Sequence, residues 1–137
     1  MLAFVIDHWF LFLALLVVLA LLVLQPALEG AAGGARVTSQ EAVRLMNRES
    51  AVVLDVREPT EFQSGHINRA LNIPLGQVAG RIPELKKFQE RPIIVYCATG
   101  ARSARAAAIL HKQGFAGARN LTGGITAWRN SNLPIES

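Results

Sequence analysis

Two short apolar runs, each followed at once by a turn and a helical pattern, constrain the fold of this chain most. AVVLDV (51–56) is rich in β-branched residues, and PIIVYC (92–97) has the same character. Runs of this length, bounded by turn residues, are typical of buried strands. Because strands and helices alternate along the chain, we expect an α/β fold with a mainly parallel sheet flanked by helices.

Further elements are indicated on both sides of these runs. Thr38 and Glu41 have the spacing of a capping box, and an apolar helical face follows them. The other expected elements are a short helix from Thr60, after Pro59 ends the strand; a short strand at 72–74; two short helices in 75–88, broken at Pro83; a helix over 103–113, ended by Gly114; a short strand at 118–121; and a last helix after a glycine turn in 123–130.

The first 28 residues differ from the rest. WFLFLALLVVLALLVL (9–24) holds sixteen uncharged apolar residues in a row, and a membrane-spanning helix needs about 20 mostly apolar residues. We therefore expect one transmembrane helix, residues 9–28, within the segment 1–28. A cleaved signal peptide is disfavoured because no Lys or Arg precedes Arg36, although AAGGA resembles a cleavage site. A buried core helix is disfavoured because the run has no polar face.

EGAAGGA (29–35) is expected to form a flexible linker to a domain that spans residues 36–137. Positive charge concentrates after the predicted span, and basic residues favour the cytoplasmic side of a membrane. We therefore expect the domain to be cytoplasmic and the N-terminus to face outward. The arginines that carry this prediction are Arg36, Arg44 and Arg48.

Composition excludes several classes of function. The formal net charge of +4 is a small excess, and the arginines form no stripe with interleaved aromatic residues, so we expect no nucleic-acid partner. Cys97 is the only cysteine. A lone cysteine excludes an internal disulfide framework and a metal site built from several cysteines. We expect no metal and no organic cofactor.

The single cysteine lies between a predicted strand and a predicted helix. Gly100 lets the intervening backbone turn sharply, and a tight loop that enters a helix directs several N–H groups inward, as an anion-binding nest. These N–H groups, the helix dipole and Arg102 should lower the pKa of Cys97 and make it a nucleophilic thiolate. The alternative, an inert buried cysteine, fits this setting poorly. The expected binding residues are Ala98, Thr99, Gly100, Ala101, Arg102 and Ser103.

The spacing from Cys97 to Arg102 indicates what the thiolate attacks. Cysteine phosphatases place one more residue between their cysteine and arginine, in a loop sized for a tetrahedral phosphate. The four residues found here make a smaller ring, with room for one sulfur atom bonded to the thiolate. The same N–H groups would then stabilise a terminal persulfide anion.

Four motifs stand in a fixed order along the chain: LDVRE (54–58), EFQSGHINRALNIP (61–74), CATGARS (97–103) and LTGGITAW (121–128). Together they cover about the whole of 36–134, which resembles a single-domain rhodanese, a sulfurtransferase. With its apolar N-terminal segment, the chain resembles bacterial membrane-anchored rhodaneses. That resemblance implies a single-pass protein of the bacterial inner (cytoplasmic) membrane.

The resemblance implies a rhodanese-like fold and a persulfide on Cys97. A donor such as thiosulfate would deliver its outer sulfur and release sulfite, and a thiol, or cyanide in vitro, would accept that sulfur. Ala98 and Thr99 are uncharged where some thiosulfate-using members have basic residues. A small persulfide or a desulfurase persulfide is therefore an alternative donor. A membrane protein or a sulfur-relay protein is a further expected partner.

Several other residues have two interpretations each. Asp55, at the end of a strand, could act as a catalytic acid, but bonding to loop amides is favoured. Arg57 either adds a positive field at the cleft mouth or is solvated. His66 resembles a structural histidine of the family, and an ionised thiolate needs no general base. Trp128 is expected to anchor the last helix in the core.

Two other functions stay open. The domain could be a membrane-tethered interaction module that keeps the fold for docking a partner and has little catalysis. An intact cysteine loop argues against that role. Arsenate or phosphate chemistry on Cys97 is the second alternative, and the short loop argues against it.

Overall fold

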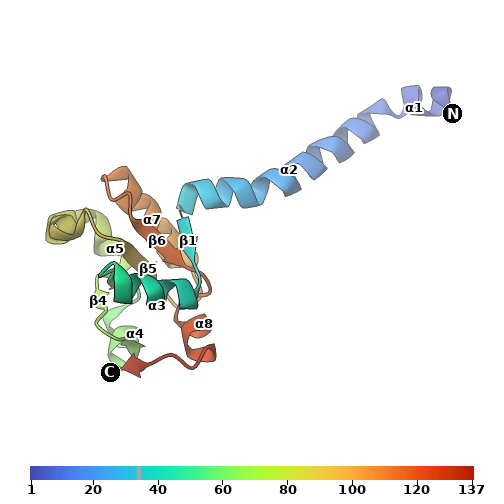
Figure 1. Ribbon diagram of the computed structural model, residues 1–137. Helices are drawn as coiled ribbons and strands as arrows, with labels where there is room; N and C mark the ends of the chain where they lie inside the picture. Colours follow the sequence, from blue (N-terminus) through green and yellow to red (C-terminus); the bar gives the residue numbers. More distant parts are fainter. Residues whose placement is uncertain (34) are drawn as a thin grey trace. The chain divides into compact units, whose positions relative to one another are not determined.

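The computed structural model describes the backbone of residues 1–33 and 35–137, and the side chains of 1–24 and 35–137. These residues form two compact units, Met1–Ala31 and Ala32–Ser137. The first unit consists of helix α1 (Leu2–Asp7) and most of helix α2 (Trp9–Gly33). The second contains the sheet and the helices that cover it (Figure 1).

The second unit alternates strands and helices along the chain. The strands are β1 (Ala35–Val37), β2 (Val52–Asp55), β3 (His66–Ile67), β4 (Leu71–Asn72), β5 (Ile93–Tyr96), β6 (Ala118–Leu121) and β7 (Ile135–Glu136). The helices are α3 (Ser39–Arg48), α4 (Pro59–Gln63), α5 (Leu75–Val78), the 3-10 helix η1 (Ala79–Arg81), α6 (Ile82–Leu85), the 3-10 helix η2 (Lys86–Phe88), α7 (Ala101–Lys112) and α8 (Gly124–Asn130).

The apolar N-terminal segment forms helices α1 and α2, as its composition predicts. Where the chain is described, however, none of its helices reaches the length and apolar content that a bilayer crossing requires. The uninterrupted apolar run stops at Leu24, before Gln25 and Pro26, and is shorter than the about 20 residues of a spanning helix. The prediction of a transmembrane helix over 9–28 is therefore not supported.

The segment 29–35, expected to be a flexible linker, is helical as far as Gly33 and enters β1 at Ala35. Residue 34 lies outside the described residues. Residues 27–32 hold three alanines, a leucine and a glutamate beside one glycine. Alanine, leucine and glutamate have high helix propensity, which favours continuation of the helix past the apolar run.

The sheet has the predicted α/β organisation. Among the described residues it contains five strands in the order β1-β6-β5-β2-β4, and every pairing is parallel. The central strand β5 lies beside β2 with Asp55 opposite Tyr96. Because parallel strands end at the same edge of a sheet, Asp55 and the residue after Tyr96, which is Cys97, emerge side by side.

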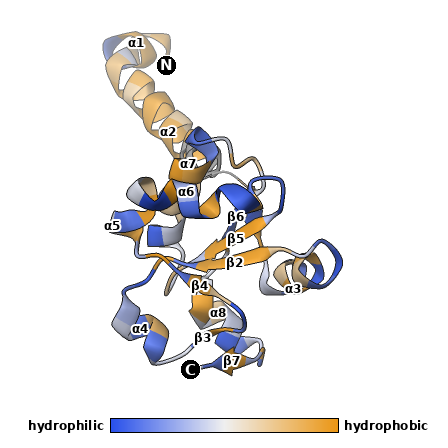
Figure 2. Ribbon diagram, turned by 90° about the vertical axis from the view of Figure 1, so that its left-hand side faces the viewer, coloured by the Kyte–Doolittle hydropathy of each residue, from blue (hydrophilic) through white to orange (hydrophobic). Residues whose placement is uncertain are grey.

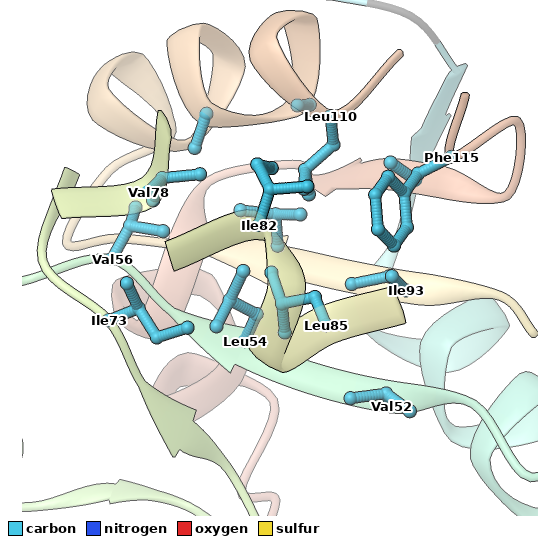
Figure 3. Close-up of a cluster of buried hydrophobic side chains, with 14 of the residues drawn as sticks. Val52, Leu54, Val56, Ile73, Val78, Ile82, Leu85, Ile93, Leu110 and Phe115 are labelled. Carbon is cyan, nitrogen blue, oxygen red and sulfur yellow. The ribbon is translucent and has the colours of Figure 1, made fainter. Parts of the chain in front are cut away.

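Apolar side chains cover both faces of the sheet. β2 and β5 are buried along their whole length, and their apolar character is visible in Figure 2. On one face, side chains of β2 and β5 meet those of α5, α6 and α7, including Val78, Leu85 and Leu110 (Figure 3). On the other face, α3 and α8 supply Ala42, Ile125 and Trp128. Cys97 belongs to the first cluster.

Helix ends follow the expected signals with small shifts. The side chain of Thr38 accepts the N–H of Glu41, as predicted for the cap of α3. Pro59 is the first residue of α4 instead of the last residue before it, because proline suits the first helical position. Pro83 likewise lies in the first turn of α6, so the helix break falls at Arg81.

Three short strands, β1, β3 and β7, were not predicted. β1 pairs with β6 at the sheet edge, and β7 pairs antiparallel with β3 in a separate ribbon. None of the three segments carries a run of β-branched residues long enough to be recognised in the sequence. Each owes its extended form to a partner strand that is far away in the sequence.

Candidate functional site

The loop that carries the single cysteine connects the central strand to a helix. β5 ends at Tyr96, and α7 begins at Ala101, two residues earlier than the sequence predicted. Gly100 precedes the helix with φ of 115°, a backbone conformation that favours glycine. This glycine turns the chain sharply enough for the first amides of α7 to face back toward Cys97.

The sulfur of Cys97 accepts hydrogen bonds from this loop. Cys97 is 1% exposed. The N–H of Gly100 lies 3.1 Å from its Sγ atom, and the N–H of Ser103 lies 3.4 Å from it. The Ser103 hydroxyl is also 3.4 Å from Sγ. The structure therefore has the inward-facing nest that the sequence predicts, with Gly100 and Ser103 as its observed donors.

These donors decide the charge state of the thiol. Burial alone would raise the pKa of Cys97, because a thiolate is poorly solvated inside a protein. Hydrogen bonds from the Ser103 side chain and from the N–H groups of Ser103, Gly100 and Thr99 outweigh burial, and the pKa of Cys97 is lowered. A cysteine with a lowered pKa has more of the nucleophilic thiolate at neutral pH.

Helix α8 holds the cysteine loop from the other side. The N–H of Ile125 donates to the Cys97 carbonyl at 2.9 Å. The Ala98 carbonyl accepts from the N–H of Thr126 at 3.2 Å and from its hydroxyl at 2.9 Å. These bonds draw two carbonyls of the loop toward α8, which leaves the loop amides free to face the sulfur. Gly124 allows this approach, because a Cβ atom there would lie 2.6 Å from the Ala98 oxygen.

Asn120 supports the loop and was not recognised in the sequence. It lies on β6 and is 6% exposed. Its Oδ1 atom accepts the Ser103 hydroxyl at 2.6 Å, and its Nδ2 group donates to the Gly100 carbonyl at 3.2 Å. Asn120 therefore fixes both residues that donate to the sulfur. Little in the sequence indicates this role, because β6 (ARNL) also carries Arg119 and the alternation does not single out Asn120 as buried.

Arg102 forms an ion pair with Glu61, a partner that the sequence pattern does not indicate. Its two terminal nitrogens donate to the two carboxylate oxygens of Glu61 on α4, at 2.8 and 3.1 Å. Both side chains are 36% exposed. The hydrogen bond that Arg102 donates to Glu61 is the largest cause that raises the pKa of Arg102, and the negative charge of Cys97 contributes less. Arg102 thus lies beside the cysteine loop, but its forked end is occupied by Glu61.

Asp55 and Arg57 form a buried pair next to the loop. Asp55 is fully buried and Arg57 is 4% exposed. The Asp55 carboxylate accepts the backbone N–H of Arg57 at 2.8 Å and its guanidinium at 2.8 Å. The guanidinium also donates to the Gly65 carbonyl at 2.7 Å. Asp55 therefore has the contacts of the structural role favoured above, and the interpretation of Arg57 as a solvated residue is wrong.

The charge of Arg57 is balanced inside the protein. Burial opposes a charged guanidinium, but the hydrogen bond and the charge of Asp55 outweigh it and raise the pKa of Arg57. A buried charge of this kind is stable only with such a partner. Arg57 therefore connects the end of β2 to the segment before β3.

His66 also makes structural contacts. Its Nδ1 atom lies 2.9 Å from the Phe62 carbonyl, and its ring stacks on Phe62 with a centroid distance of 3.8 Å. Its Nε2 atom lies 3.4 Å from the Glu136 carboxylate. Both ring nitrogens thus face groups of α4 and β7, which is the arrangement of a positioning histidine.

The remaining loop residues, Ala98, Thr99 and Ala101, form the solvent-facing side of the loop, which is the entrance to the cysteine. Thr99 and Ala101 are exposed, and Ala98 is half-buried. The first-turn amides of a helix have no carbonyl acceptor within it, so those of Ala101 and Arg102 remain for an anionic group. Within the described side chains, 1–24 and 35–137, no three His, Cys, Asp or Glu residues gather in a way that could hold a metal ion.

Comparisons with known proteins identify the family to which the chain is similar. The family model described as "Rhodanese-like domain" matches residues 38–131. A sulfurtransferase of Allochromatium vinosum is 40% identical over 92 residues, which cover 67% of this chain and 84% of that protein. The thiosulfate sulfurtransferase GlpE of Pseudoalteromonas translucida is 35% identical over 88 residues, or 64% and 82% of the two chains. The crystal structure of a rhodanese-related protein from Thermoplasma volcanium superposes with a TM-score of 0.68 at 28% identity, and covers 75% of this chain and 98% of that one.

Proposed function

Because the chain belongs to the rhodanese-like domain family, we propose that it is a sulfurtransferase that carries one sulfur atom as a persulfide on Cys97. The observation that carries this proposal is the environment of the Cys97 sulfur. It is buried, it accepts N–H groups of Gly100 and Ser103, and its pKa is lowered. A stabilised thiolate in a ring of this size is suited to bonding a single sulfur atom.

The proposed reaction has two displacements at sulfur. In the first, the Cys97 thiolate attacks the outer sulfur of the donor, a new S–S bond forms, and the donor's own bond to that sulfur breaks. With thiosulfate the leaving group is sulfite, and with a persulfide it is a thiolate. In the second, an acceptor thiolate attacks the outer sulfur of the Cys97 persulfide and leaves with it, which restores the Cys97 thiolate. Cyanide would replace the thiol in vitro and leave as thiocyanate.

The loop has separate groups for the two states of the enzyme. Gly100 and Ser103 already donate to Sγ, and they stabilise the thiolate that each displacement uses or releases. The amides of Ala101 and Arg102, in the first turn of α7, are available to the terminal sulfur of the persulfide. The first displacement uses the thiolate form of Cys97, so the attack itself requires no proton transfer.

The donor and acceptor are finer proposals. Thiosulfate is one donor, which the name of the Pseudoalteromonas relative suggests. A small persulfide or a desulfurase persulfide is the other, because Ala98 and Thr99 bring no positive charge to the entrance. The acceptor that we propose is a small thiol or a cysteine of a sulfur-relay protein.

The direct test is the intact mass of the full chain after treatment with thiosulfate or cysteine persulfide, and again after cyanide. We expect the gain of one sulfur atom and its loss to cyanide, and we expect neither change in Cys97→Ser. A chain that gains no sulfur from either donor would refute the proposal and favour the docking module. Hydrolysis of an aryl phosphate that depends on Cys97 would instead support phosphate chemistry.

A further inference from the structure

The entrance of the cysteine loop contains an ion pair that joins two elements far apart in the sequence. Glu61, on α4, accepts both terminal nitrogens of Arg102, on α7, at 2.8 and 3.1 Å. This two-point geometry is the strongest form of arginine–carboxylate pairing. It engages the face of the guanidinium that would otherwise bind an anionic oxygen.

Glu61 is fixed in this position by its own helix. Its Oε1 atom accepts the backbone N–H of Glu58 at 3.2 Å, in a capping box that starts α4. The hydrogen bond from Arg102 is the largest cause that lowers the pKa of Glu61 to about 2. At neutral pH the entrance therefore has a permanent, well-placed negative charge.

Charges around the loop leave no excess of positive charge for a donor. Arg57 is paired with Asp55, and Arg102 is paired with Glu61. When Cys97 is a thiolate, these five groups sum to one net negative charge. A dianion such as thiosulfate meets more repulsion there than a donor with a single negative charge, because Coulomb energy scales with the product of the charges.

We propose that Glu61 determines donor specificity: by occupying the forked end of Arg102, it disfavours dianionic sulfur donors and leaves persulfides of low charge as the better donors. This inference rests on the proposed sulfur transfer. It assigns to Glu61 a role beyond capping α4. A dianion must break or share the Glu61–Arg102 pair, whereas a persulfide with one negative charge encounters a smaller barrier.

Glu61→Gln tests the inference with little change in shape. A glutamine at this position of a capping box still accepts the Glu58 N–H, so α4 should be retained. We expect kcat/KM for thiosulfate to rise by roughly three- to tenfold, which corresponds to the loss of one screened charge near a dianion. With cysteine persulfide the change should stay below about twofold. High salt should reduce the difference in kcat/KM for thiosulfate between the wild type and Glu61→Gln.

Glu84→Gln is the matched control. Glu84 forms a similar two-point pair with Arg81, at 2.6 and 3.0 Å, in and beside α6. Its substitution removes the same charge at a distance from the cysteine loop. The kcat/KM for thiosulfate divided by that for cysteine persulfide should therefore not change. Thermal unfolding of both variants checks that each is folded.

A second measurement separates this inference from the proposed function. Alkylation of Cys97 by iodoacetate, an anion, is compared with alkylation by neutral iodoacetamide. The rate with iodoacetate divided by the rate with iodoacetamide should rise in Glu61→Gln and should equal the wild-type value in Glu84→Gln. This readout needs no sulfur transfer, so it succeeds or fails independently of the enzyme assay.

Three outcomes would overturn the inference. If Glu61→Gln alters neither the donor ratio nor the alkylation ratio, Glu61 has no electrostatic effect on the entrance. If Glu61→Gln changes kcat/KM for both donors by the same factor, and the alkylation rates of both reagents by the same factor, Glu61 acts only by positioning the loop. If the wild-type chain takes sulfur from neither donor, but Glu61→Gln still raises the alkylation ratio, the proposed enzyme activity and the donor preference are both refuted. Only the effect of the Glu61 charge on the entrance is then retained.

Discussion

Gly124→Ala should damage the cysteine loop although residue 124 belongs to a different helix. An added Cβ atom would lie 2.6 Å from the Ala98 oxygen and closer still to the Cys97 oxygen. Non-bonded heavy atoms prefer about 3.5 Å or more, so α8 and the loop would have to separate by about 1 Å. Gly124 also has φ of 59°, which is unfavourable for alanine.

The cost can be worked out from the bonds at this junction. The left-handed conformation costs alanine about 1 kcal/mol. Separation weakens the bonds from Ile125 to the Cys97 carbonyl and from Thr126 to the Ala98 carbonyl, each of which contributes about 1 kcal/mol. We expect the free energy of unfolding to fall by about 3 kcal/mol. In a domain of this size, that corresponds to a drop in Tm on the order of 15 °C.

Persulfide formation should fall together with stability. A shift of about 1 Å in a reacting group can cost roughly 100-fold in rate, so the variant should form persulfide about 100 times more slowly even where it is folded. Urea denaturation and the rate of sulfur uptake from thiosulfate measure the two effects. The control is Gly80→Ala, where a Cβ atom would have no neighbour within 4 Å. A Gly124→Ala chain as stable and as active as this control would refute the packing of α8 on the loop.

Two further predictions concern buried hydroxyl groups. Tyr96→Phe removes the hydroxyl that accepts the Ile67 N–H at 3.0 Å; a buried donor without an acceptor should lower the free energy of unfolding by about 1–3 kcal/mol in urea denaturation, and an unchanged value would mean that the bond contributes nothing. Ser103→Ala removes the hydroxyl whose hydrogen bond with the Cys97 sulfur lowers the pKa of Cys97, so that pKa should rise and the pH profile of alkylation by iodoacetamide should move to higher pH. Ser64→Ala, which removes an exposed hydroxyl, should leave the profile in place, and the same profile in Ser103→Ala would contradict the assigned hydrogen bond.

The central strands and the cysteine loop could be predicted because their signals are local. β2 and β5 are short β-branched runs, and Gly100 marks the turn into α7. The end of that helix was predicted by Gly114, which has φ of 91°. In each case the residue that gives the signal also makes the structure, through a backbone preference or through burial.

The partners of the site could not be predicted, because they depend on distant parts of the chain. Glu61 and Arg102 are separated by 41 positions, and Ser103 and Asn120 by 17. Sequence spacing gives no information about contacts at that range. The burial of Arg57 was missed because arginines are usually exposed, although Asp55 two residues earlier was an available sign of a local pair.

The role of the nucleophile stays a prediction, but its setting is now defined by contacts. The sequence predicts that all six residues from Ala98 to Ser103 form the cradle. The amides of Gly100 and Ser103 lie within hydrogen-bond distance of the sulfur, and that of Thr99 contributes least to lowering the pKa of Cys97. Ala98 instead presents its carbonyl to α8, because a tight loop cannot turn every peptide group inward.

The attachment of α8 to the cysteine loop also has a consequence in time. Thr126 lies 28 positions after Ala98, so a ribosome completes the cysteine, its strand and α7 before it makes the helix that holds the loop. Until α8 docks, the carbonyls of Cys97 and Ala98 lack these partners. We therefore expect the cysteine loop to take its final shape only after α8 has been made and has docked.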